Sequence, residues 1–64
     1  MKIKILLGEI RTRRGMSLEV LSKKSGVSRS HINFIENRMR NPTISVMCKL
    51  AKALGVGLDD IVKF

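Results

Sequence analysis

The chain has 64 residues, of which 44% are hydrophobic, so we expect one domain with a single core and exclude both a two-domain organisation and wholesale disorder. Thirteen Lys and Arg against five Asp and Glu give a net charge of +8, which is typical of proteins that bind polyanions, nucleic acid ahead of anionic membranes. The charge is uneven, because residues 1–40 carry ten basic and three acidic side chains, or +7, and residues 41–64 carry only +1.

Several classes of protein are excluded by what the sequence lacks. The apolar run at residues 5–7 is far shorter than the roughly 20 residues that cross a bilayer, and it is too short for a secretory signal. Cys48 has no second cysteine to pair with, and together with His31 it offers too few ligands for a structural zinc site. No catalytic constellation and no phosphate-cradling glycine loop is present. We therefore expect a cytoplasmic protein that is not an enzyme and that holds no metal and no cofactor.

Capping residues divide the chain into helical segments. Gly15, Gly26 and Gly55 each follow a helix-like segment, where a C-cap glycine belongs. Ser17 and Ser28 each precede such a segment and are good N-cap residues. Together with the apolar periodicity, these signals predict five helices, over residues 4–14, 18–25, 29–36, 44–54 and 58–62. The predicted fold is all-α, a compact five-helix domain that occupies residues 1–64.

The apolar stripes of the predicted helices indicate which residues form the core. Leu6, Leu7 and Ile10 give the first helix its stripe, although residues 2–5 alternate as in a short edge strand. In the fourth helix the apolar residues at helical spacing are Ile44, Met47, Leu50, Ala51 and Leu54. Cys48 lies beside that stripe, and we interpret it as a small core residue rather than a redox sensor.

The spacing between the second and third predicted helices is the most informative feature of the chain. Only three residues separate them, and Val27, Ile32 and Ile35 are placed to fill the wedge between the two helices. A short turn between two packed helices is the helix-turn-helix arrangement, here over residues 17–36. It leaves the outer face of the second helix of the pair, Ser28–Glu36, free to enter a major groove.

Five segments carry a resemblance to a known family: GMS at 15–17, LSKKSGVSRS at 21–30, INFIEN at 32–37, LAKALGV at 50–56 and LDD at 58–60. With these motifs the chain resembles the phage repressor and Cro-like helix-turn-helix family, the XRE-type regulators, over residues 6–62. The resemblance implies a repressor-like domain that binds double-stranded DNA at a palindromic operator as a homodimer and represses transcription. We expect no membrane partner, and no small-molecule effector because the chain has no room for an effector domain.

The resemblance also implies a set of DNA contacts. The exposed recognition-helix positions that read bases are taken by Arg29, Ser30, Asn33 and Phe34. Arg29 suits guanine O6 and N7, Asn33 suits adenine, and Phe34 suits a thymine methyl group. The residues expected at phosphates, which fix the register without reading sequence, are Ser17, Leu18, Ser28, His31, Asn37, Arg38, Arg40 and Asn41.

The resemblance also implies one structural pair, and the chain departs from the family pattern at several positions. Arg11 and Glu36 align with a family pair that forms an internal salt bridge between the first helix and the end of the third. Leu18 replaces a frequent Gln, so only its backbone N–H remains for a phosphate. Arg38 replaces a frequent Gly, which implies strain if that site requires a positive φ. Gly57 replaces a common Ser and gives a weaker N-cap.

The dimer surface is expected at the C-terminal end, where the apolar side chains exceed what one short helix can bury: Val56, Leu58, Ile61, Val62 and Phe64. An alternative for this region pairs residues 2–5 with residues 61–64 as short strands.

A second alternative concerns function, since a chain of this fold could be a protein-interaction module, such as an antitoxin that mainly binds a partner protein. Binding to random duplex that weakens steeply with salt would favour the DNA-binding hypothesis over the module.

Overall fold

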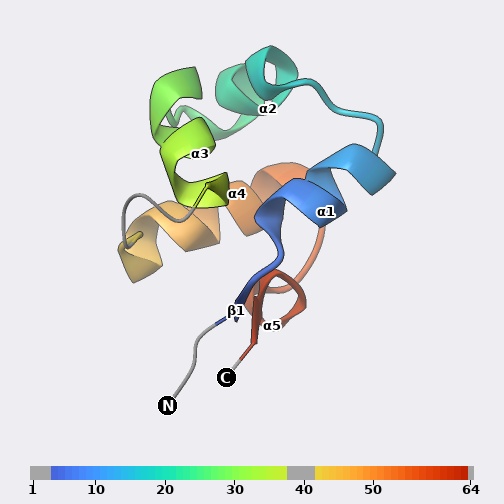
Figure 1. Ribbon diagram of the computed structural model, residues 1–64, viewed down its shortest axis with the longest axis vertical. Helices are drawn as coiled ribbons and strands as arrows, with labels where there is room; N and C mark the ends of the chain where they lie inside the picture. Colours follow the sequence, from blue (N-terminus) through green and yellow to red (C-terminus); the bar gives the residue numbers. More distant parts are fainter. Residues whose placement is uncertain (1–3, 38–41, 64) are drawn as a thin grey trace.

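Five helices and two short strands make up the part of the chain that the computed structural model describes, residues 4–37 and 42–63. In chain order the elements are β1 (Lys4–Ile5), α1 (Leu7–Arg13), α2 (Leu18–Ser25), α3 (Arg29–Glu36), α4 (Ile44–Leu54), α5 (Leu58–Ile61) and β2 (Val62–Lys63). Figure 1 shows α2 and α3 at one end of the molecule, α5 and the strands at the other, and α1 and α4 between them. The predicted all-α, five-helix class is confirmed, with a small two-stranded ribbon added to it.

The ribbon joins the two ends of the described chain. Its strands are antiparallel, with Lys4 opposite Lys63, and the Leu6 N–H donates a hydrogen bond to the Ile61 carbonyl oxygen at 2.8 Å. The expected helix start at residue 4 is therefore wrong, because α1 begins only after the strand. The alternation that suggested an edge strand corresponds to a real strand, and the pairing between the chain ends lies within one chain.

Local capping sets the ends of the helix-turn-helix pair. The Ser17 Oγ accepts a hydrogen bond from the Val20 N–H at 3.1 Å, and the Ser28 Oγ accepts one from the His31 N–H at 3.2 Å. Both contacts satisfy backbone donors in the first turn of a helix. Gly26 ends α2 with a φ of 76°, a conformation that costs other residues strain. These signals were readable from the sequence, and the bounds of α2 and α3 agree with them.

The core consists of aliphatic side chains from all five helices and from the turn before α3. Its buried members are Leu7, Leu21, Val27, Ile32, Ile35, Met47, Leu50, Ala51, Leu54 and Ile61. Helix α2 packs on both α3 and α4, and α4 also packs on α5. Ile61 is 0% exposed, so it belongs to this core, and its prediction as a dimer contact is wrong. As the last residue of α5, it is tied by its own carbonyl to the start of α1.

Two further expectations about α4 are corrected. Ile44 is 67% exposed, because it begins the helix one turn before the buried Met47 and extends past the area that the other helices cover. Cys48 is exposed and is a free cysteine. One residue step rotates the side chain by about 100° around a helix, which turns Cys48 away from the buried stripe that includes Met47.

Within residues 4–37 and 42–63, no helix is long and apolar enough to cross a membrane.

Candidate nucleic-acid interface

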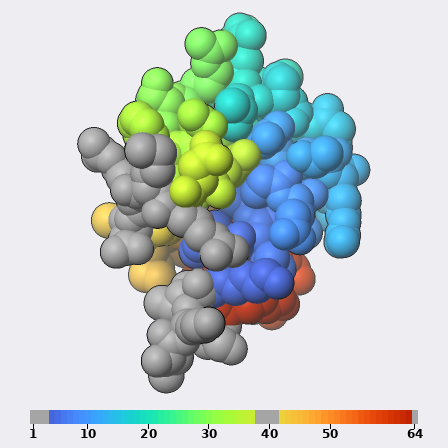
Figure 2. All heavy atoms as spheres, viewed as in Figure 1, coloured from blue at the N-terminus to red at the C-terminus, as the bar shows by residue number. Residues whose placement is uncertain are grey.

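Helix α3 is held against the body by one face and presents the other outward. Ile32 and Ile35 are buried in the core, whereas Arg29, Ser30 and Asn33 are exposed. Three or four residues separate positions on one face of a helix, so the polar and apolar sets lie on opposite sides. Figure 2 shows α3 at the surface of the molecule, beside residues of α1 and α2. The exposed face therefore presents a guanidinium, a hydroxyl and a carboxamide together.

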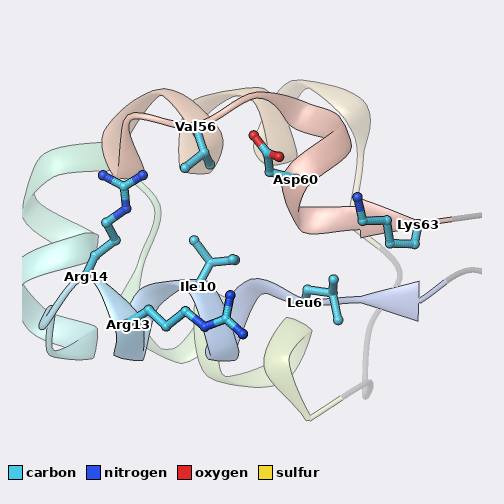
Figure 3. Close-up of a pocket in the computed structure, with 7 residues that line it drawn as sticks. All are labelled: Leu6, Ile10, Arg13, Arg14, Val56, Asp60 and Lys63. Carbon is cyan, nitrogen blue, oxygen red and sulfur yellow. The ribbon is translucent and has the colours of Figure 1, made fainter.

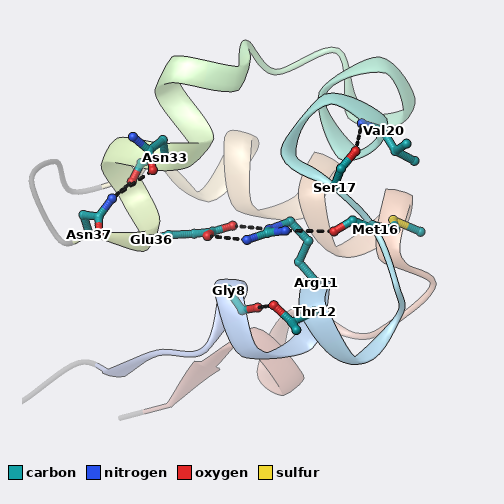
Figure 4. A network of polar contacts seen from close by, with 9 residues as sticks. All are labelled: Gly8, Arg11, Thr12, Met16, Ser17, Val20, Asn33, Glu36 and Asn37. Atoms are coloured by element: carbon teal, nitrogen blue, oxygen red, sulfur yellow. Dashed lines mark hydrogen bonds and ion pairs between the residues drawn. The ribbon is translucent and has the colours of Figure 1, made fainter.

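The predicted base readers differ in how freely they are presented. Arg29 and Ser30 stand exposed in the first turn of α3. The Asn33 carboxamide is held, because the Asn37 Nδ2 donates to both the Asn33 Oδ1 and the Asn33 carbonyl oxygen, each at 2.9 Å (Figure 4). The bond to Oδ1 fixes which way that oxygen points and leaves the amide donors of Asn33 available. Phe34 is half-buried, so a part of its ring surface is covered by the domain itself.

The predicted phosphate contacts gather at helix ends. Ser17 and Ser28 each use a hydroxyl oxygen as a helix cap, and each hydroxyl keeps its own hydrogen to donate. Leu18 is half-buried and packs against the core, so its backbone N–H at the start of α2 is the group left for an anion. His31 is half-buried and Asn37 is exposed. The remaining predictions, Arg38, Arg40 and Asn41, lie outside the described residues.

An ion pair ties the end of α3 to α1. The Arg11 Nε donates to the Glu36 Oε2 at 2.7 Å, and the Arg11 Nη2 donates to the Glu36 Oε1 at 3.0 Å. A third donor, Nη1, reaches the Met16 carbonyl oxygen at 2.8 Å, so one guanidinium bridges α1, α3 and the turn before α2 (Figure 4). The side chains are only 18% and 12% exposed, so the pair is mostly shielded from water. These are the two residues for which the resemblance implied a salt bridge.

The electrostatics of this pair keep the guanidinium charged. The hydrogen bond to Glu36 raises the pKa of Arg11 above its ordinary value, burial opposes that shift, and the charge of Glu36 adds to it. The bridge therefore cannot be lost through deprotonation of Arg11 at any pH at which the protein is handled. By contrast, the Lys23 Nζ lies 3.7 Å from the Glu19 Oε1 on the exposed face of α2, where water screens the attraction.

Gly8 makes room for the carboxylate of Glu36. A Cβ atom added at Gly8 would lie 3.0 Å from the Glu36 Oε1 and 3.3 Å from its Cδ. Such a contact is tighter than ordinary packing, so any larger residue here would push on the carboxylate that Arg11 holds. A glycine inside a helix normally costs stability, and at this position the close approach of α3 accounts for it.

Three structural roles in the fold are absent from the sequence-based predictions. The Asn33–Asn37 bond has an i, i+4 spacing within one helix and its C-cap, a signal that was available in the sequence. Thr43 caps α4, with its Oγ1 accepting from the Val46 N–H at 3.2 Å, and Ser/Thr before an apolar stripe is the usual sign of a cap. The contact of Gly8 with Glu36 has no local signal, because the two residues meet only in the fold.

Known proteins resemble this chain in sequence. The helix-turn-helix family pattern matches residues 7–61. An uncharacterized HTH-type transcriptional regulator of Archaeoglobus fulgidus is 36% identical over 56 residues, which are 88% of this chain and 80% of that protein. Another, of Sinorhizobium fredii, is 34% identical over 53 residues, covering 83% of this chain and 69% of that one.

A solved structure agrees with the sequence relatives. The crystal structure of the restriction-modification controller protein C.AhdI from Aeromonas hydrophila superimposes with a TM-score of 0.82 at 37% identity, covering 84% of this chain and 82% of that one. The class defined by the fold and the exposed α3 is thus a helix-turn-helix domain. The chain belongs to the helix-turn-helix family of DNA-binding transcriptional regulators.

Proposed function

We propose that this chain is a sequence-specific transcriptional repressor that binds a palindromic operator as a homodimer, with α3 of each subunit in the major groove. The observation that carries the proposal is the outward polar face of α3, on which Arg29, Ser30 and Asn33 are exposed while Ile32 and Ile35 fix the helix to the body. A helix presented in this way fits the width of a major groove. The net charge of +8 supports a polyanionic partner.

The proposed base contacts follow from the chemistry of the exposed groups. Arg29 offers two parallel donors for guanine O6 and N7. Asn33 offers an amide donor and a carbonyl acceptor for adenine, and the bond from Asn37 supports this role by holding the carboxamide in one orientation. Ser30 can donate or accept, so it contributes little discrimination. Phe34 would contact a thymine methyl group with the part of its ring that the domain leaves uncovered.

The proposed backbone contacts surround this face. Ser17 and the Leu18 N–H stand at the N-terminus of α2, and Ser28 stands at the N-terminus of α3. His31 and Asn37 lie on α3 and at its end. Arg38, Arg40 and Asn41 would complete the set from the segment that follows α3. These contacts would hold the protein in register on the duplex and would supply most of the salt-sensitive affinity.

A homodimer is proposed because one domain of this size reaches few bases. Four of the predicted interface residues remain candidates: Val56, Leu58 and Val62, which are half-buried, and Phe64, which lies outside the described residues. Two copies related by a twofold axis would place their α3 helices in successive major grooves, about 34–36 Å apart. Joining the half-sites raises both affinity and specificity without any new type of contact.

Selection of bound sites from a random duplex pool tests the proposal directly. We expect two inverted half-sites with centres about one helical turn apart. Binding to random duplex should also weaken with salt, by about 0.9 log unit of affinity per log unit of salt for each phosphate contacted. The proposal would be contradicted if the captured duplexes shared no sequence and the affinity did not change with salt concentration. That outcome would favour the protein-interaction module.

The substitution Arg29→Ala should separate base reading from phosphate binding. We expect it to weaken binding to the selected operator by about 1–3 kcal/mol and to relax the preference at one base position of each half-site. Arg40→Ala should instead weaken the selected and random duplexes alike, because phosphate contacts are independent of sequence. Fluorescence anisotropy on both duplexes measures the difference. If the two variants behave identically, the assignment of Arg29 is wrong.

A further inference from the structure

A groove lies between α1 and the C-terminal elements, away from the proposed DNA-binding face. It measures about 410 Å³ and is lined by Leu6, Ile10, Arg13, Arg14, Val56, Asp60 and Lys63. In Figure 3 Arg14 and Lys63 stand toward opposite ends, with the aliphatic side chains of Ile10 and Val56 between them. None of the lining residues belongs to α2 or α3. The groove therefore combines an apolar floor with cations at both ends.

The cations of the groove are not neutralised by the domain. Among the described residues, the side chains of Arg13, Arg14 and Lys63 have no ion pair and no side-chain hydrogen bond. The one carboxylate in the lining, that of Asp60, already accepts a hydrogen bond from the Gly57 N–H at 2.9 Å, which caps α5. Three positive charges thus face one carboxylate that has a structural use. An anionic occupant would be attracted to both ends.

The strand register adds a fourth positive charge near one end. Lys4 lies directly opposite Lys63 in the antiparallel pair, and opposite residues of such a pair carry their side chains on the same face. Like charges directly opposite one another are destabilising. Both lysines are exposed, and Lys4 has no ion pair among the described residues. An anion bound at this end would relieve that repulsion, which makes the Lys63 end the stronger attractor.

The composition of the groove discriminates between occupants. A DNA backbone would satisfy the cations but would leave the exposed parts of the half-buried Leu6, Ile10 and Val56 without an apolar partner. A second copy of this chain is a poor match, because it carries five acidic residues against thirteen basic ones. A small amphiphile with one carboxylate would serve one end of the groove only. A segment with several carboxylates and aliphatic side chains between them satisfies the floor and both ends.

We propose that this groove docks an acidic peptide segment of a partner protein, with aliphatic side chains on the floor and carboxylates against Arg13, Arg14 and Lys63. The site lies on elements other than α3, so a partner bound there leaves the exposed face of α3 uncovered. The groove would give the protein a second binding surface, separate in chemistry and in position from the one proposed for DNA. The described lining of the groove contains none of the proposed DNA contacts, and it shares Val56 with the proposed dimer surface.

The test is an NMR titration of the ¹⁵N-labelled full chain with a peptide of alternating Glu and Leu residues. We expect amide shifts at Ile10, Arg14, Val56 and Lys63, with Arg29 and Asn33 unmoved. The double variant Arg14→Glu/Lys63→Glu should weaken peptide binding at least about tenfold, as expected for charges in direct contact. The matched control is Lys49→Glu/Lys52→Glu on the exposed face of α4, because each double variant lowers the net charge from +8 to +4. The control should weaken binding by less than about threefold.

Four results of the binding measurements with peptide and decanoate would overturn the proposal. Two of them concern the ligand: a peptide of alternating Glu and Ser that binds as tightly as the Glu and Leu peptide, or decanoate that binds more tightly than the peptide, which would assign the groove to small carboxylates. The other two are equal losses of peptide affinity in the two double variants, and amide shifts centred on α3. Random-duplex binding is measured on both double variants as well, and a larger loss in Arg14→Glu/Lys63→Glu would place the groove at the DNA. If that variant does not fold by circular dichroism, Arg14→Gln/Lys63→Gln takes its place with the same expected direction.

Discussion

Leu50→Ala is expected to lower the free energy of unfolding by about 2–5 kcal/mol, the range for removing a buried leucine side chain from a packed core. Leu50 is fully buried in the middle of α4, the helix that packs on both α2 and α5. A domain of 64 residues has only about 3–10 kcal/mol in total, at roughly 0.05–0.15 kcal/mol per residue. The variant should therefore lose a large share of its stability, and its urea and thermal midpoints, measured by circular dichroism, should fall well below those of the parent chain.

Val20→Ala provides the comparison for this prediction. Val20 is an aliphatic residue of α2 that is 41% exposed, so its truncation leaves no closed cavity. Its expected effect is within about 0.5 kcal/mol, as for most surface substitutions. A large cost at Val20 together with a small cost at Leu50 would show that the core is assigned to the wrong face.

Much of the fold was predictable because its signals are local. Ser17, Ser28 and Gly26 fix the ends of α2 and α3 through contacts within a few residues, so the helix-turn-helix bounds agree with the structure. Ile44 and Cys48 were misassigned to the core because a periodic pattern gives the direction of a stripe but not how far neighbouring helices cover it. Coverage depends on tertiary packing, which no short window of sequence contains.

The chain ends show a second limit of sequence-based prediction. Local sequence leaves residues 4–5 open between a helix start and an edge strand, and the apolar excess at the C-terminal end predicts Ile61 on a dimer surface. In the fold the two segments pair with each other across more than fifty residues, which makes β1 a strand, and Ile61, directly before β2, lies in the core. Long-range strand pairing is decided by the whole topology.

In the candidate site, too, local features are predictable from the sequence and long-range contacts are not. The outward position of Arg29 and Asn33 follows from helical periodicity, since Ile32 and Ile35 define the inner face. The partnership of Arg11 with Glu36 joins residues 25 apart, and only the family resemblance pointed to it. No local signal in the sequence indicates a role for Gly8, because its contact with Glu36 exists only in the fold. Chemistry on one helix can be inferred locally, whereas contacts that brace one helix against another cannot.

Arg11→Ala and Glu36→Ala are each expected to destabilise the fold by about 2–3 kcal/mol, somewhat less than the roughly 3–5 kcal/mol for a fully buried pair because these side chains keep some exposure. Arg11→Ala should be the costlier change. It leaves Glu36 as an uncompensated, shielded carboxylate and also removes the donor to the Met16 carbonyl. Thermal and urea unfolding of the single and double variants measures both costs.

The double variant decides whether the bridge acts as a unit. If Arg11 and Glu36 stabilise each other, the cost of removing both should fall short of the summed single costs by about 1–2 kcal/mol, within the usual range for residues in contact. The exposed pair Glu19 and Lys23, 3.7 Å apart on α2, is the matched control and should couple by less than about 0.5 kcal/mol.

Because Glu36 is the last residue of α3, the variants at Arg11 and Glu36 should also weaken operator and random duplex binding together, through a loosened helix rather than a lost base contact. Additive costs would mean that α1 and α3 are held by the apolar core alone, and that the ion pair only accompanies their contact.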